Sequence, residues 1–232
     1  MLTTVEFGGY IARWPSSLES LILCGQNNTD WRSLPHEVLS EKDAGKQLCR
    51  CLRNLSPHLR HLSVRNLIKI RELLGPVWPV GPEDRSITPL REPDIPVYQL
   101  LETVDFHYTS LNYRVEWYKD NDDFNEQEVT RLWRQNVAFA AARLAAYMPR
   151  LRRMTVTQRP MMWAGKHGLR YEVREGRAEL VFSSSFEFKP REWVVGAWAA
   201  VAKRRGLTLA VRTEKLEAVP KDGSVPVQTD NS

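Results

Sequence analysis

The chain has 232 residues, 42% of them hydrophobic and 26% charged, with a formal net charge of +5. This is the composition of an ordinary globular protein of one domain or two small ones, and it argues against disorder. The sequence has no apolar run near the roughly 20 residues of a membrane-spanning helix and no secretory signal at its N-terminus, so we predict a soluble intracellular protein, cytoplasmic or nuclear.

A six-residue pattern, Leu-x-x-apolar-x-apolar, occurs four times along the chain. The copies begin at Leu18, Leu59, Leu101 and Leu151, and three of them follow shortly after a proline. Side chains alternate between the two faces of a strand, so the last two apolar residues of each copy share a face. Recurrence after 41, 42 and 50 residues predicts about four strand-helix units of an irregular leucine-rich-repeat-like α/β fold.

Helical spacing follows the first two predicted strands. Between the cap-like Ser40 and Pro57, apolar residues recur every three or four positions, which predicts a helix over residues 40–55. A shorter helix is expected over residues 67–74, because its apolar residues share one face. A strand followed by a helix is therefore the expected repeat unit.

Residues 75–97 interrupt this alternation, because six prolines and two glycines crowd there. Proline lacks a backbone donor and restricts the residue before it, so neither a helix nor a central strand is expected. We predict an exposed Pro-rich loop inserted into the domain. Pro76, Pro79 and Pro82 have the spacing of a groove-binding ligand, but few basic residues flank them, and we interpret the segment as a spacer.

The strongest helical pattern follows an acidic run at residues 120–123. Asn125 and Glu128 resemble a capping box, and the acidic run lacks the glycine and terminal glutamate of a calcium loop. The apolar residues that follow form one continuous stripe: Val129, Leu132, Trp133, Val137, Ala140, Ala141, Leu144 and Met148. We predict a helix that covers one face of the sheet, with Arg131, Arg134 and Arg143 off the buried stripe.

The last third of the chain has a different pattern. Alternation of apolar and polar residues over 169–173 and 178–182, around a turn at Glu175 and Gly176, predicts a β-hairpin. A helix that starts at Pro190 and ends at Gly206 is expected next, with Trp193 and Trp198 on its apolar stripe, and then a closing strand. We predict a hairpin-helix-strand subdomain over residues 157–211 and a disordered tail over residues 215–232.

Charge is unevenly distributed along the chain. Residues 150–232 contain 16 Lys or Arg against 9 Asp or Glu, whereas the first 149 residues are slightly acidic. A basic half can attract phosphates or an acidic partner. Because its arginines are interleaved with predicted strand and helix positions, a solvated basic face is the simpler interpretation, and nucleic-acid binding by the C-terminal half is the alternative.

Possible catalytic residues are few and scattered. An enzyme would draw on His107, Asp120, Asp122 or His167, but nothing in the sequence brings these side chains together. The serines at 183–185 lack the Gly-x-Ser-x-Gly elbow of a hydrolase. We therefore predict that the protein is not an enzyme and name no catalytic residue.

Metal binding is also not predicted. The possible ligands are Cys49, Cys51, His36, His58 and His61. The two cysteines are separated by a single residue, which does not match the usual spacing of zinc ligands. An odd, sparse set of three cysteines also argues against a disulfide-stapled domain. We expect no metal and no cofactor.

Four segments together resemble a known family. They are Trp14-Pro15-x-x-Leu18-x-x-Leu21, Ala140-Ala141-Ala142 leading to Met148-Pro149-x-Leu151-x-x-Met154, Leu169-Arg170-Tyr171, and Ala197-Trp198-x-x-Val201-Ala202. Over residues 14–211 the chain resembles a domain of unknown function in filamentous-fungal proteins that often carry an F-box ahead of leucine-rich-repeat-like strands. The resemblance implies an adaptor or substrate receptor, with the F-box docking to a ubiquitin-ligase scaffold.

The F-box itself is not evident in this chain. Residues 34–39 look like the start of one, but a repeat strand is predicted already at Leu59. We predict a single leucine-rich-repeat-like α/β domain over residues 1–214. Its expected role is that of an uncharacterised protein-interaction module that binds one or more protein partners, with no membrane and no small-molecule substrate.

Overall fold

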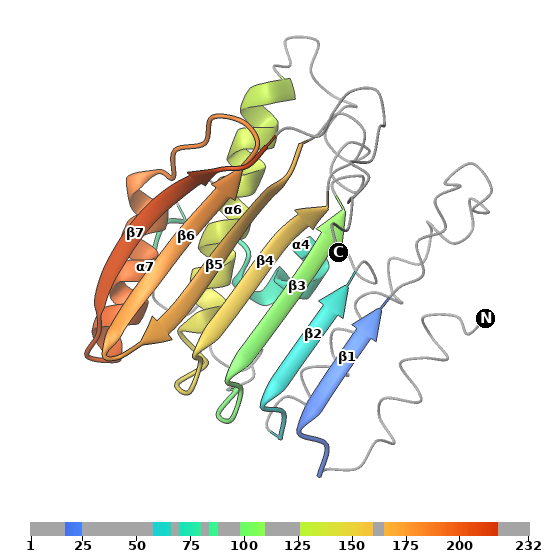
Figure 1. Cartoon of the computed structure of the whole chain (residues 1–232), viewed down its shortest axis with the longest axis vertical. Coiled ribbons are helices and arrows are strands. Elements are labelled where there is room, and N and C mark those ends of the chain that lie inside the picture. The colour runs from blue at the N-terminus through green and yellow to red at the C-terminus, as the bar shows by residue number, and fades with distance from the viewer. Residues whose placement is uncertain are drawn as a thin grey trace, which may run out of the picture.

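The structure, a computed structural model, describes residues 17–24, 58–65, 70–79, 84–87, 98–109, 126–159 and 165–217. In these residues seven strands form one mixed sheet in which the strand order equals the chain order (Figure 1). The strands are β1 (Ser20–Cys24), β2 (His61–Arg65), β3 (Thr103–Thr109), β4 (Arg153–Arg159), β5 (His167–Arg174), β6 (Arg177–Ser184) and β7 (Thr208–Lys215). The helices are α4 (Ile70–Leu73), the 3-10 turn η1 (Gly75–Val77), α6 (Glu126–Ala145) and α7 (Glu192–Arg204). The fold is therefore mixed α/β.

The four copies of the six-residue pattern form four neighbouring parallel strands. Leu21, Leu62, Val104 and Met154 are register partners across β1 to β4, and all four are buried. The second apolar position aligns in the same way two residues later in each strand. The pattern therefore sets both the order and the register of the parallel half of the sheet.

Backbone hydrogen bonds repeat at the entrance to these strands. The carbonyl of Glu19, directly after Leu18, accepts the N–H groups of Arg60 and His61. In the same way, the carbonyl of Arg60 accepts the N–H groups of Glu102 and Thr103 in the third copy. The carbonyl of Glu102 accepts those of Arg152 and Arg153 in the fourth copy. The Arg60 guanidinium also lies 3.5 Å from the Glu19 carboxylate and 3.1 Å from that of Glu102. Equivalent positions in successive copies thus bind one another directly.

The parallel arrangement ends at β4. β5 runs antiparallel to both β4 and β6, and β7 is again parallel to β6. The turn between β5 and β6 has positive φ at both Glu175 (46°) and Gly176 (76°), as a type I′ turn requires. The predicted hairpin, helix and closing strand correspond to β5, β6, α7 and β7. β7 extends to Lys215, one residue into the predicted tail, and residues 218–232 lie outside the described part.

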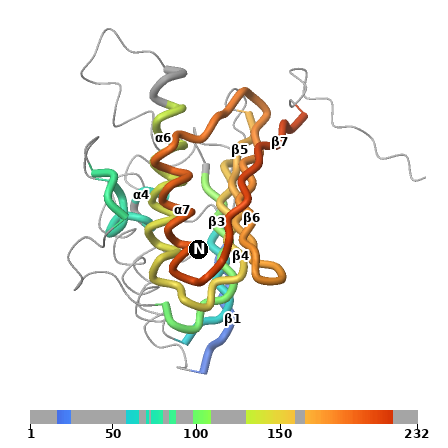
Figure 2. The backbone as a smooth tube through the Cα atoms, turned by 90° about the vertical axis from the view of Figure 1, so that its left-hand side faces the viewer, coloured from blue at the N-terminus to red at the C-terminus, as the bar shows by residue number. Residues whose placement is uncertain are grey.

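Helices α4, α6 and α7 all lie on one side of the sheet (Figure 2). α6 carries small residues where it meets the sheet and α7, and Ala138, Ala140, Ala141 and Ala142 are almost fully buried. Alanine in these positions lets backbones approach closely and favours the helix. Trp198 of α7 lies in the same core.

Two arginines of α6 are buried, contrary to the prediction that they lie off the buried stripe. Only 6% of Arg134 and 3% of Arg143 is exposed, whereas Arg131 is exposed. The reason is that elements other than the sheet also cover α6: α7 on one side and the start of the Pro-rich segment, through η1, on the other. A helix covered on several sides buries polar positions as well, and these then need partners.

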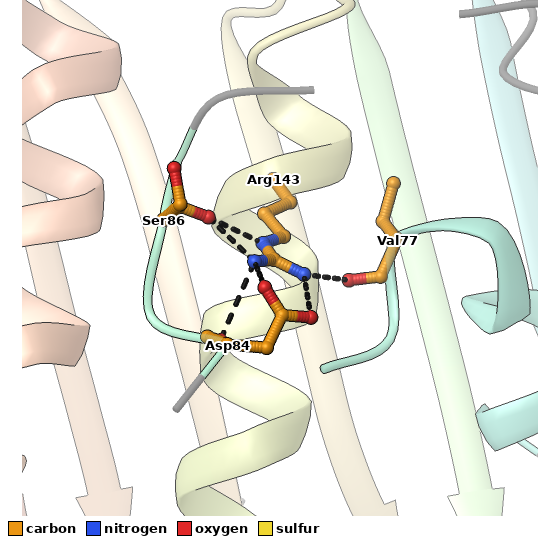
Figure 3. Close-up of polar contacts among 4 residues, drawn as sticks. All are labelled: Val77, Asp84, Ser86 and Arg143. Atoms are coloured by element: carbon orange, nitrogen blue, oxygen red, sulfur yellow. Dashed lines mark hydrogen bonds and ion pairs between the residues drawn. The ribbon is translucent and has the colours of Figure 1, made fainter. Parts of the chain in front are cut away.

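The described parts of the Pro-rich segment are packed on α6, which corrects the prediction of an exposed loop. Val77 and Trp78 are buried, and the Trp78 ring lies 4.8 Å from that of Trp133. Arg143 forms an ion pair with Asp84 and donates to the backbone carbonyls of Ser86 and Val77 (Figure 3). The remainder of the segment, residues 80–83 and 88–97, lies outside the described residues, as does the helix predicted over residues 40–55.

Candidate interaction surface

The face of the sheet opposite the helices, here called the open face, carries every second residue of each strand. Figure 1 looks onto this side, and no described helix lies on it (Figure 2). Its residues in β1 to β4 are Ser20, Ile22, Cys24, His61, Ser63, Arg65, Thr103, Asp105, His107, Arg153, Thr155 and Thr157. In β5 to β7 they are Gly168, Arg170, Glu172, Arg174, Arg177, Glu179, Val181, Ser183, Thr208, Ala210, Arg212 and Glu214.

This open face is polar, in contrast to the buried face. Among these residues there is no Phe, Tyr or Trp, because the described aromatic residues of the strands all belong to the buried face. Ile22 is the main apolar exception, with 65% of its surface exposed. An antiparallel sheet often keeps one polar face in solvent, but parallel strands are normally covered on both faces. The parallel half of this sheet thus has a polar face on which no helix of the described residues lies.

Asp105 is the centre of a hydrogen-bonded group on β2 and β3. Its carboxylate accepts from Ser63 Oγ at 3.3 Å and from Arg65 Nη2 at 3.2 Å. His107 Nε2 lies 3.1 Å from the same Asp105 oxygen, Oδ2, and Arg65 Nε donates to Ser63 Oγ. These four side chains satisfy one another. The histidine does not lie between a hydroxyl and a carboxylate, as it would in a Ser-His-Asp triad, so the group has no geometry for nucleophilic catalysis.

The other three carboxylates of the open face are also paired. Glu172 binds Arg174 at 2.9 Å, and Arg212 lies 2.7 Å from Glu179 and 3.2 Å from Glu214. All of these side chains are partly exposed, so each pair contributes little to folding stability. Because every carboxylate on the described open face is paired with a basic side chain, none is left to attract a cation.

Three arginines of the open face differ from the rest. The guanidinium groups of Arg153, Arg170 and Arg177 make no hydrogen bond or ion pair with any other residue in the described part of the chain. Among the side chains that the structure describes, the open face holds six arginines against four carboxylates, which is an excess of positive charge. We call Arg153, Thr155 and Arg170, which adjoin one another on β4 and β5, the arginine patch.

A second polar group lies on the buried face, at the carboxyl end of β4. Arg134 Nε donates to Gln158 Oε1 at 3.0 Å, and the guanidinium lies 3.8 Å from the centre of the Phe186 ring. His167, the register partner of Gln158, packs edge-on against Phe188. Gln158 Nε2 and His167 Nδ1 have no hydrogen-bond partner among the described residues.

His167 is held neutral by its surroundings. Burial, and secondarily the nearby Arg134 charge, lower the pKa of the imidazole from 6.5 to about 3. Only 4% of the residue is exposed, so its protonated form has lost nearly all of its hydration. A buried neutral histidine packed on two phenylalanines is accounted for as part of the core.

The two described residues among those considered for catalysis, His107 and His167, do not lie together. His107 lies on the open face and His167 on the buried face, on opposite sides of the sheet. Asp120 and Asp122 lie outside the described residues. Ser183 donates to Glu214, and Ser184 is buried on the other face.

Of the possible metal ligands, His58 and His61 belong to the described residues. His61 Nδ1 lies 2.6 Å from Thr103 Oγ1, His58 is exposed, and Cys24 is a free, exposed thiol. Cys49, Cys51 and His36 fall outside the described ranges. Within those ranges, no group of three or more His, Cys, Asp or Glu residues is arranged to hold a metal ion.

Alternation in the sequence is a weak signal for the arginine patch. Arg153, Thr155 and Thr157 alternate with apolar residues, as do Arg170 and Glu172, so their common face could be expected. Which carboxylates neutralise which arginines depends on the neighbouring strands, and that could not be foreseen. Among the described residues, no helix combines the length and apolar character needed to cross a lipid bilayer.

Comparison with known proteins identifies one family. Residues 13–225 match a family of unknown function, DUF6546, and this range includes all seven described strands. No curated protein and no solved structure matches the chain. Because the match extends over far more than half of the sequence, the chain belongs to the DUF6546 family of unknown function.

Proposed function

We propose that this chain is a protein-interaction module that binds a protein partner on the open face of its sheet. The observation that carries the proposal is the open face itself, a polar surface across seven strands that no described helix covers. Parallel strands are normally covered on both sides, so an uncovered parallel half is expected to serve binding. The module has no catalytic role and no cofactor in this proposal.

The repeated strand entrances support a leucine-rich-repeat-like character. Successive copies place equivalent residues side by side, and repeat proteins of this kind use such strand surfaces to hold partners. The resemblance to F-box-associated domains supports a more specific role, that of a substrate receptor or adaptor fragment acting inside the cell. In that role the open face holds the target protein.

The alternative, a nucleic-acid-binding module, is supported by the excess of arginine on β4 to β6. Two features of the open face argue against it. The face offers no aromatic side chain on which an unpaired base can stack. Three of the six arginines described on this face are already paired with carboxylates, which leaves fewer guanidinium groups for a phosphate backbone.

Site-specific photo-cross-linking in cells of the source organism tests the proposal. A photoreactive phenylalanine analogue replaces Ile22 or Thr157 on the open face and, as a control, Arg204, which is exposed at the end of α7 on the helix-covered side. Protein adducts are expected from the two open-face positions and not from position 204. Adducts only at position 204, no adducts at all, or salt-sensitive nucleic-acid adducts at the open face would contradict the proposal.

A further inference from the structure

We infer that the partner segment is acidic and extended, and that it docks along β4 and β5 through the arginine patch. This inference rests on the proposed function, because it names the chemistry of the partner that the open face binds.

Availability of charge singles out the arginine patch. Asp105, Glu172, Glu179 and Glu214 all have arginine or histidine partners on the sheet. Arg153 and Arg170 have none among the described residues. A guanidinium is permanently charged and presents a planar fork of donors that matches a carboxylate, so an arginine without a partner on a protein surface favours a carboxylate ligand.

The positions of the two arginines fix their spacing. Arg153 is the register partner of Glu172, and Arg170 is two residues from Glu172 on the same strand, so the two arginines are diagonal neighbours across β4 and β5. Diagonal neighbours on one face have Cα atoms about 7 to 8 Å apart. Thr155, the register partner of Arg170, places a hydroxyl between them that can donate to an anion.

An extended acidic peptide has the matching repeat. In a strand-like chain, residues i and i+2 are on the same side and about 6.6 to 6.8 Å apart. A segment with carboxylates at alternate positions, of the form Glu-x-Glu, therefore presents one carboxylate to Arg153 and one to Arg170 at once. Single-stranded nucleic acid fits less well, because its bases have no aromatic side chain to stack on here.

The first experiment measures binding of a defined probe. A ¹⁵N-labelled protein is titrated with a short peptide of alternating Glu and Thr, and with the same peptide carrying Gln in place of Glu. The acidic peptide is expected to shift the amide signals of β4 and β5 around Thr155 and Arg170, and the Gln peptide is not. Equal shifts with both peptides, larger shifts with a single-stranded oligonucleotide, or shifts confined to another face would overturn the inference.

Matched variants separate a specific site from general attraction. The double variant R153Q/R170Q is compared with K203Q/R204Q, which removes the same charge from exposed residues at the end of α7. The patch variant is expected to weaken peptide binding about tenfold and the control less than twofold. Equal weakening by both variants would mean that only net charge matters and would overturn the inference.

Failure of this inference can be told apart from failure of the proposed function. If open-face photo-cross-links to a protein partner form in the wild type and persist in R153Q/R170Q, the open face binds protein but the arginine patch does not select it. If no protein is cross-linked at the open face at all, the proposed function itself is wrong.

Discussion

Trp198 of α7 donates its indole N–H to the backbone carbonyl of Ala138 in α6, with the nitrogen and oxygen 3.1 Å apart. The same indole stacks on the ring of Tyr171 in β5, with ring centres 4.8 Å apart. One fully buried side chain therefore joins both long helices to the middle of the sheet, which makes it a sensitive point for stability.

Replacing Trp198 with alanine is expected to lower the free energy of unfolding by about 3 to 5 kcal/mol, because a large buried ring and its hydrogen bond are both lost. Trp198→Phe keeps much of the volume and loses the hydrogen bond, so a smaller loss of about 1 to 2 kcal/mol is expected. Urea denaturation followed by circular dichroism measures both. A loss below about 1 kcal/mol for Trp198→Ala would contradict this account of the core.

Arg143→Met is expected to cost about 3 kcal/mol, because it leaves Asp84 and two backbone carbonyls without their common donor. Arg150→Met, at an exposed arginine just beyond α6, serves as the control and should change stability by less than about 0.5 kcal/mol. The double variant Arg143→Met/Asp84→Ala should lose much less stability than the two single variants added together. The reason is that it also removes the Asp84 carboxylate, which Arg143→Met leaves without its ion-pair partner. Additive losses would show that the ion pair does not hold the Pro-rich segment to α6.

His167 predicts a defined dependence of stability on pH. The folded imidazole stays neutral down to about pH 3, whereas in the unfolded chain it takes up a proton near its ordinary pKa of 6.5. The unfolded state therefore binds more protons between these values, and stability falls as the pH is lowered through 6.5. The slope from this group is at most about 1.4 kcal/mol per pH unit.

The difference in unfolding free energy between wild type and His167→Gln isolates this term, since the remaining titrating groups are common to both. Urea denaturation at pH 7.5, 6 and 5 should show the wild type losing its advantage as the solution becomes acidic. His58→Gln, at an exposed histidine, is measured in parallel as the surface variant. A difference for His167→Gln that does not vary with pH would mean that this imidazole is not buried in its neutral form.

Gln135 joins α6 to the segment that leads into α7. Its amide donates to the Lys189 carbonyl at 2.9 Å and accepts the Arg191 N–H at 3.0 Å. Gln135→Ala is expected to cost about 1 to 3 kcal/mol and to speed hydrogen exchange of the Arg191 amide. Hydrogen-exchange NMR measures the second effect directly, and unchanged exchange at that amide would contradict the role of this contact.

Substitutions on the open face, unlike those in the core, should leave the stability of the fold almost unchanged. R153Q/R170Q is expected to change the free energy of unfolding by less than about 0.5 kcal/mol, because neither arginine has a partner in the described structure. Thermal and urea unfolding of the double variant check this. A large loss of stability would show that these arginines serve folding, which would remove the reason to assign them to a partner.

Sequence periodicity predicted the parallel half of the sheet well, for a physical reason. Leu21, Leu62, Val104 and Met154 recur at fixed positions within their copies, and the two-residue period of a strand then determines which face each residue joins. The same period predicted the hairpin and the closing strand. The reversal of direction between β4 and β5 was not predicted, because the six-residue pattern ends at Val156 and says nothing about the direction of the strand that follows.

The burial of Arg134, Gln135 and Arg143 could not be predicted from the helical pattern. A helix seen alone has one apolar stripe, and polar residues outside it are assigned to solvent. Here α7 and the Pro-rich segment cover those positions, and the partners lie 24 to 66 residues away in the sequence, as with Gln158 and Val77. The charge balance of the open face has the same origin, because Asp105 and Arg65 are 40 residues apart.

The identity of strand order and chain order also bears on how a family of this kind can grow. Among the described residues, each ladder joins a strand only to its immediate predecessor and successor, and the ladder of β1 is with β2. A gene that gained or lost one copy ahead of β1 would lengthen or shorten the stack by a whole unit, leaving the remaining pairings intact. The number of strands in the sheet can therefore change by whole copies while the pairings at the hairpin end are kept.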